Sequence, residues 1–191
     1  MPRSNVLTNN GAITVAGTVK ITQDVVGTGS FAFVPPIPAP LGSGGGFLSL
    51  ANYSRLELDG AVGGGQTIKM ANGGDNFGIL VIGDLPDFHA TIAGFTRQVP
   101  NGDANAVTGD TIELKGNITG LNYLNTGWGH PSQLQLFHGR HLEGTLNFDQ
   151  YIPQHVFPDQ TFTLTHVGND TILHTGYWSN PITAATPTTT V

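Results

Sequence analysis

The sequence predicts an all-β domain, arranged as an antiparallel sandwich, jelly roll or barrel with extended arms. Short runs of alternating or β-branched residues recur along the chain, as is typical of strands. Glycines, prolines and Asn-Gly pairs separate these runs at the positions where turns would lie. The chain has 191 residues, a length that suits one domain. Many short strands with frequent turn signals are typical of sandwiches and barrels.

The N-terminal part predicts a hairpin. The turn signal Asn9–Gly11 precedes a strand candidate at Ala12–Val15, and a second candidate follows at Thr18–Val26. Because Asn-Gly beside apolar runs is a strong hairpin signal, we expect residues 1–26 to be hairpin-like. Ser30–Val34 is a short aromatic strand candidate. No internal repeat of fixed period is visible in the chain.

A proline-rich and glycine-rich segment gives the clearest candidate boundary. Pro35–Pro40 favours an extended polyproline stretch, and Gly42–Gly46 is a flexible glycine run. We therefore predict N-terminal strands or an arm at residues 1–34 and a linker at residues 35–46. The alternative is that residues 35–46 form a surface crossover between two strands. The all-β body then covers residues 47–179, and residues 180–191 form an extended C-terminal tail.

The body contains the remaining strand candidates. In one of them Leu56 and Leu58 alternate with Arg55 and Glu57, which predicts one buried and one exposed face. The residues around Gly168–Asp170 predict a hairpin between the last two runs. The candidates are Phe47–Leu50, Tyr53–Leu58, Thr67–Met70, Phe77–Ile82, Phe88–Val99, Thr111–Ile118, Leu134–Phe137, Leu142–Phe148, Thr161–Val167 and Thr171–Tyr177.

Composition excludes several functions. Charged residues make up 10% of the chain, against about 25% in typical globular domains. The seven basic residues are scattered and the net charge is -6, so we expect no nucleic-acid binding. No apolar run is long enough to span a bilayer, and the N-terminus has no secretory signal. The absence of cysteine excludes disulfides and thiolate chemistry.

Histidines are the main candidates for a metal site, because six of the seven lie after residue 129. The segment His138–Gly144 resembles the first cupin motif, in which two histidines and a glutamate on a β-barrel hold a metal. The resemblance covers seven residues and implies His138, His141 and Glu143 as ligands. The cupin pattern requires His-x-His, whereas these histidines are three apart and would point to opposite faces of an extended strand. We therefore expect polar surface histidines, no metal and no cofactor.

Other catalytic or ion-binding patterns are incomplete. The loop at residues 101–113 has alternating oxygen ligands, but it lacks the glycine and the correctly placed carboxylate of a calcium loop. Neither a Gly-x-Ser-x-Gly elbow nor a phosphate-binding glycine loop is present. We therefore expect that the protein is not an enzyme.

Aromatic residues near polar residues suggest a contact site. Trp128 precedes His130 in a glycine-rich stretch, and Tyr177 and Trp178 lie near Asn180. Such residues can stack on a sugar ring, anchor a protein interface or pack on the core.

A surface poor in charge is weakly protected against association. We therefore expect a structural assembly protein, with a virion component such as a capsid decoration (cement) protein, head fibre or tail protein as its most specific form. Its expected partners are copies of itself, with a trimer favoured, and other capsid or filament subunits; a glycan is a further possible partner. It would be made in the cytoplasm and reside in a virion or extracellular particle. The alternatives are a carbohydrate-binding β-sandwich module and a cupin-like metal-dependent enzyme. Contacts with other chains are expected from residues 1–10, 35–46 and 180–191, with Pro35, Pro36, Pro38 and Ile182 as interface candidates.

Overall fold

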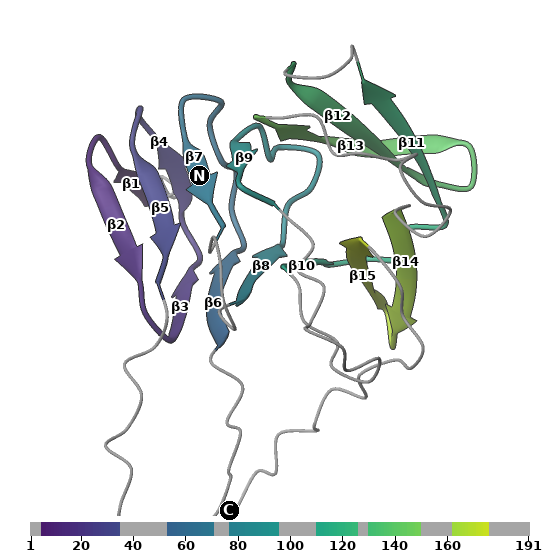
Figure 1. The fold of residues 1–191 in the computed structure, drawn as a ribbon, viewed down its shortest axis with the longest axis horizontal. Coiled ribbons are helices and arrows are strands. Elements are labelled where there is room, and N and C mark those ends of the chain that lie inside the picture. The colour runs from purple at the N-terminus through teal and green to yellow at the C-terminus, as the bar shows by residue number, and fades with distance from the viewer. Residues whose placement is uncertain are drawn as a thin grey trace, which may run out of the picture.

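The computed structural model describes residues 5–34, 53–70, 77–95, 110–125, 130–149 and 162–175. These residues form fifteen β-strands and no helix, which confirms the predicted all-β class. Two large sheets of seven and six strands and a narrow two-stranded sheet surround one core (Figure 1). The two large sheets face each other as the layers of a sandwich do.

The first ten strands wind around the core as a short β-solenoid of four rungs. Each rung contributes one strand or residue to each of three sides of the core, in the order two-stranded, seven-stranded and six-stranded sheet. Corresponding strands of successive rungs pair in parallel. In the third and fourth rungs a single residue stands where β1 and β4 lie in the first two rungs. Val62 forms a parallel bridge with Val25, and Phe88 forms one with Val62. The strands are β1 (Val6–Thr8), β2 (Ala12–Val15), β3 (Thr18–Ile21), β4 (Asp24–Val26), β5 (Ser30–Phe33), β6 (Tyr53–Leu58), β7 (Thr67–Lys69), β8 (Phe77–Ile82), β9 (Thr91–Ala93) and β10 (Thr111–Leu114).

This pairing corrects the expected antiparallel arrangement and N-terminal hairpin. Eight strand pairs are parallel. The Asn9–Gly11 segment turns the chain from one sheet into the next instead of folding β2 back on β1. The carbonyl of Gly11 accepts a hydrogen bond from Ser30 N of the following rung, at 2.8 Å. The turn was recognised correctly, but the strand's partner lies one rung further along the chain.

Insertions at one corner of the solenoid hide its repeat. In the two-stranded and seven-stranded sheets, register partners of the first two rungs are 18 residues apart, as for Val6 and Asp24 or Ala12 and Ser30. The separation is 37 residues for Ser30 and Thr67, and 24 residues for Thr67 and Thr91. Residues 35–52, 71–76 and 96–109 all connect a strand of the seven-stranded sheet to one of the six-stranded sheet. Because the insertions differ in length, the rungs share no constant period.

The strand pairing also bears on the predicted domain division. Strands β3 and β5 precede the segment 35–46, and they pair with β6 and β7, which follow it. Residues 5–34 therefore belong to the same sheets as the body and do not form a separate arm. The segment 35–46 connects two strands of one rung and itself lies outside the described residues, as does the predicted tail 180–191.

The C-terminal strands extend both large sheets beyond the fourth rung. Here the pairing is mostly antiparallel, and β14 and β15 form the hairpin predicted around Gly168–Asp170. The hairpin β12–β13 joins the seven-stranded sheet through a parallel contact with β9. The strands are β11 (Gly120–Asn125), β12 (Ser132–His138), β13 (His141–Phe148), β14 (Phe162–Val167) and β15 (Asp170–Thr175).

The core consists of columns of apolar side chains that run along the solenoid. In the seven-stranded sheet, Phe31, Ile68 and Ile92 lie in register. In the six-stranded sheet the corresponding column is Leu56, Leu80 and Ile112. All six side chains are fully buried and belong to one cluster, so each rung covers the apolar side chains of its neighbours.

Two buried amides bridge three rungs at the corner between the two-stranded and seven-stranded sheets. Asn9 Nδ2 donates to Gln66 Oε1 at 2.9 Å, and Gln66 Nε2 donates to Asn9 O at 2.9 Å and Val26 O at 3.1 Å. Asn9 lies in the first rung and Gln66 in the third. The second rung contributes Gly27 and Gly29 at this corner, where any Cβ atom would overlap Asn9. The glycines therefore leave the space through which the two amides meet.

Candidate functional site

The outer surface of the six-stranded sheet carries every ion pair found among the described residues. Lys20 Nζ lies 2.7 Å from Glu57 Oε1 and 2.8 Å from Asp59 Oδ2. Hydrogen bonds with Asp59 and then Glu57 raise the pKa of Lys20 above its ordinary value of 10.5. Lys20 therefore stays protonated throughout the neutral range, and its charge links the first rung to the second.

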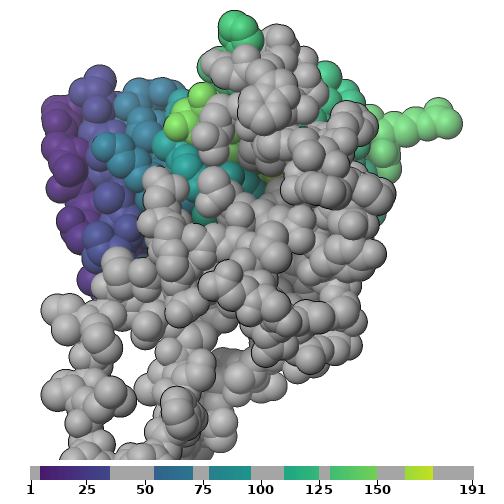
Figure 2. Space-filling model, viewed as in Figure 1, coloured from purple at the N-terminus to yellow at the C-terminus, as the bar shows by residue number. Residues whose placement is uncertain are grey.

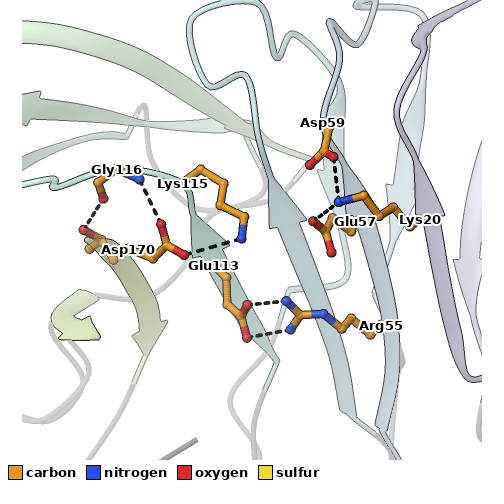
Figure 3. Close-up of polar contacts among 9 residues, drawn as sticks. Lys20, Arg55, Glu57, Asp59, Glu113, Lys115, Gly116 and Asp170 are labelled. Atoms are coloured by element: carbon orange, nitrogen blue, oxygen red, sulfur yellow. Dashed lines mark hydrogen bonds and ion pairs between the residues drawn. The ribbon is translucent and has the colours of Figure 1, made fainter. Parts of the chain in front are cut away.

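A bidentate ion pair crosses the middle of this surface. Arg55 Nη1 and Nη2 donate to Glu113 Oε1 and Oε2 at 2.8 and 2.7 Å, over the intervening strand β8 (Figure 3). Hydrogen bonding with Glu113 raises the pKa of Arg55. Val81 lies in register with Glu57 on one side and Glu113 on the other. It is fully buried although it lies outside the core cluster, and we attribute its burial to the ion pair that spans it.

A third pair joins the solenoid to the C-terminal hairpin β14–β15. Lys115 Nζ lies 3.4 Å from Asp170 Oδ2, and both side chains are more exposed than Arg55 and Glu113 (Figure 3). Next to it, the buried hydroxyl of Thr171 donates to Gly116 O at 2.8 Å and accepts from Ile118 N at 2.9 Å. These contacts hold the end of β10 against β15.

We call the outer surface of the six-stranded sheet the charged surface. Its glutamates are bound by basic side chains. The carboxylate of Glu57 accepts a hydrogen bond from Lys20, and that of Glu113 accepts two from Arg55. Within the described ranges, no group of three or more histidine or acidic side chains is placed to hold a metal. The arrangement joins neighbouring strands and rungs, which is a stabilising role.

The outer surface of the seven-stranded sheet differs sharply from the charged surface. Two rows of small side chains cross its parallel strands in register. Only Lys69 among them carries a charge. We call this surface the neutral face; it consists of Ala12, Thr14, Ser30, Ala32, Thr67, Lys69, Thr91 and Ala93.

Paired amides continue the uncharged surface onto the C-terminal strands. Asn122 Nδ2 donates to Gln135 Oε1 at 3.0 Å, and Gln133 Nε2 donates to Asn147 Oδ1 at 2.9 Å. All four residues point away from the core, because they alternate with inward-facing residues such as Leu134 and Leu146. The whole outer surface of this sheet is thus rich in hydroxyl, methyl and amide groups.

The structure corrects the expected placement of the histidines. His138 and His141 are register partners across the two-residue turn of the β12–β13 hairpin. Directly opposed residues lie on the same side of a sheet, so the two imidazoles do not point to opposite faces. The turn explains the difference, because Gly139 has a φ of 61° and reverses the strand direction between the two histidines.

The third cupin-like residue is displaced by a β-bulge. Leu136 pairs with Gly144 while Phe137 pairs with Leu142, which leaves Glu143 without a register partner. His138 Nδ1 lies 2.7 Å from the carbonyl oxygen of Asn117. His138, His141 and Glu143 do not form a metal-binding group in the structure.

Most predicted interface residues fall outside the described part of the chain. This applies to Trp128, Tyr177 and Trp178 as well as to Pro35, Pro36, Pro38 and Ile182. His130 is described and is exposed just before β12. Of the calcium-loop residues, Glu113 is described, and its carboxylate binds Arg55.

Sequence reasoning missed the Arg55–Glu113 pair and the Asn9–Gln66 pair. The alternation in β6 correctly indicated that Arg55 and Glu57 face outward. It contains no information about a partner 58 residues away. A search for charged residues on alternating strands would have found the surface, but only the rung order assigns the partners.

The ion pairs can be compared by substituting the cation. Replacing Arg55 with methionine should lower the free energy of unfolding by about 1–2 kcal/mol, because a bidentate, partly buried pair is lost and Val81 is uncovered. Lys115→Met is the matched control and should cost less than about 0.5 kcal/mol. The side chains of Arg55 and Glu113 are 28% and 25% exposed, against 42% and 43% for Lys115 and Asp170. Urea unfolding of both variants measures the difference, and equal losses would contradict it.

Comparison of the chain with protein-family models, curated proteins and solved structures gives no match. The part of the chain that the structure describes has no helix long and apolar enough to cross a membrane.

Proposed function

We propose that this chain is a structural protein that acts through contacts between its subunits. The observation that supports this proposal best is the neutral face. Apart from Lys69, its side chains are small and uncharged, whereas the opposite sheet carries the ion pairs.

The energetic argument concerns desolvation. Burying a charge is costly unless it is paired, whereas methyl groups and hydroxyls cost much less to remove from water. A surface of mostly small side chains also loses little side-chain entropy when it is covered. Of the two large sheet surfaces, the neutral face is therefore the one that another subunit could cover at the lower cost.

The solenoid supports the same role. Its rungs stack through continuous backbone ladders and a single core, so its surfaces keep their shape when they meet a partner. Within this class, the charge-poor surface favours a virion component, such as a decoration protein, head fibre or tail protein. A homo-oligomer, with a trimer favoured, remains the proposed state.

Sedimentation velocity of the purified full chain tests the proposal. We expect an oligomer whose stability depends little on salt, because the proposed contact has almost no charge. Thr67→Asp places a carboxylate in the middle of the neutral face and should weaken association about tenfold or more. Thr163→Asp, on β14 of the other large sheet, is the matched control and should leave association unchanged.

Two outcomes would contradict the proposal. A chain that sediments as a monomer at every concentration would exclude self-assembly. An oligomer that Thr67→Asp and Thr163→Asp weaken equally would show that the neutral face has no special part in the contact.

A further inference from the structure

The first rung of the solenoid ends all three sheets at once. Strands β1, β2 and β3 are the last strands of the two-stranded, seven-stranded and six-stranded sheets within the described part of the chain. At the other end, β11–β15 extend both large sheets beyond the fourth rung (Figure 1). In Figure 2 the first rung forms the purple left-hand end of the molecule.

The backbone of this rung has hydrogen-bonding groups that point away from the molecule. Backbone N–H groups of the second rung donate hydrogen bonds to the carbonyls of Asn9, Gly11, Val15, Gly17 and Ile21. Successive residues of a strand direct their backbone groups to opposite sides. The residues between them therefore direct N–H and C=O groups toward the open end. These open-edge residues are Val6, Thr8, Ala12, Thr14, Thr18 and Lys20, and their side chains are all exposed.

The apolar core is also incompletely covered at this end. Leu7, Ile13 and Val19 point inward and pack on the core, but each is only partly buried. Their register partners in the second rung, Val25, Phe31 and Leu56, are almost completely buried. The difference arises because the first rung has a neighbour on one side only.

Within strands β1, β2 and β3, and among the residues that the structure describes next to them, the usual protections of an exposed strand edge are missing. Native edges are commonly blocked by proline, by lysine or by a covering segment. Strands β1, β2 and β3 contain no proline, and their single charged residue is Lys20. Lys20 is bound to Glu57 and Asp59 of the second rung, so its charge is already neutralised. Val6 adds an exposed apolar side chain to the edge.

We propose that the first rung pairs end to end with the first rung of a second copy of this chain. This inference rests on the proposed assembly function and names the surface and partner for one of its contacts. A single peptide strand can satisfy only one of the three edges. A second first rung presents three edges with the same strand lengths around the same perimeter, and it also covers Leu7, Ile13 and Val19.

The symmetry of the contact follows from the direction of the chain. A two-fold axis perpendicular to the solenoid makes the two rungs run in opposite directions. The strands of the two copies then pair antiparallel, and the two large sheets of each copy continue into those of the other. The pairing doubles the number of copies in the particle, whatever number is joined through the neutral face.

Two variants of the full chain test the pairing. Thr8→Pro removes a backbone N–H that points to the open end and leaves the bonds between the first two rungs intact. Val6→Lys places a charge on the same edge. Each should halve the particle mass measured by sedimentation equilibrium and raise the dissociation constant about tenfold or more. Circular dichroism checks that both variants remain folded.

The controls use the same type of exchange. Val167→Lys alters an exposed valine in the C-terminal hairpin, where Val167 is 40% exposed and Val6 is 52% exposed. Thr8→Val keeps the N–H at the open edge. Both controls should retain the mass of the parent chain.

The outcomes separate this inference from the proposed function. If the parent chain associates and neither Thr8→Pro nor Val6→Lys changes its mass, end-to-end pairing is wrong and assembly through another surface stands. If the parent chain is monomeric at every concentration, both are wrong. If the edge variants halve the mass and Thr67→Asp has no effect, pairing is supported and the role of the neutral face is overturned.

Discussion

Replacing Gln66 with leucine is expected to lower the free energy of unfolding by about 2–4 kcal/mol. The Gln66 side chain is fully buried and makes three hydrogen bonds, two of them with Asn9. Leucine has a similar size but cannot replace these bonds. The Nδ2 donor of Asn9 then keeps only a 3.4 Å contact with Ser30 O. A buried donor that loses its partner costs more than the bond itself contributes.

The matched control is Gln133→Leu. Gln133 also bonds an asparagine amide, that of Asn147, but this pair is exposed to water. Water can replace the lost bond, so we expect a change within about 0.5 kcal/mol. Urea unfolding of the two variants, with equal m-values, gives the comparison. Equal destabilisation would show that the buried Asn9–Gln66 bridge contributes no more to the free energy of unfolding than the exposed Gln133–Asn147 pair.

Leu80→Ala is expected to lower the free energy of unfolding by about 3–5 kcal/mol. Leu80 lies on β8, between Leu56 of β6 and Ile112 of β10, and it is 0% exposed. Truncation removes apolar contacts and leaves a cavity in the middle of a column. Neighbouring backbones are held by ladders on both sides of β8, so the cavity can collapse only in part.

Leu124→Ala is the control for the core variant. Leu124 lies on the edge strand β11 and is 41% exposed, so its truncation should cost less than about 1 kcal/mol. Thermal and urea unfolding measure both variants. A loss at Leu80 no greater than that at Leu124 would contradict the assignment of the Leu56–Leu80–Ile112 column to the core.

Much of the local structure could be predicted from the sequence. The alternation of Leu56 and Leu58 with Arg55 and Glu57 correctly indicated which side chains face the core. The β14–β15 hairpin was predicted because its two strands are neighbours in both sequence and space. Predictions that depended only on adjacent residues were therefore the most successful.

The direction of pairing and the candidate sites could not be predicted in the same way. A strand with one face in the core alternates identically in parallel and antiparallel sheets, so β2 gave no sign that its partner is β5. Insertions of unequal length at one corner removed the periodicity that reveals a solenoid. The turn at Gly139 brought His138 and His141 to one side, where spacing alone predicted opposite sides.

The sequence by itself determined that this chain is all β, that Leu56 and Leu58 of β6 face inward, and that a hairpin turns around Gly168–Asp170. These properties depend on alternation and on the backbone preferences of glycine, asparagine and proline, which act over a few residues. Only the tertiary structure decided that the turns lead into a parallel solenoid, that Arg55 meets Glu113, and that the first rung forms the last strand of all three sheets within the described residues. Those features depend on contacts between residues far apart in the chain, and the stacking of rungs on a shared core selects them.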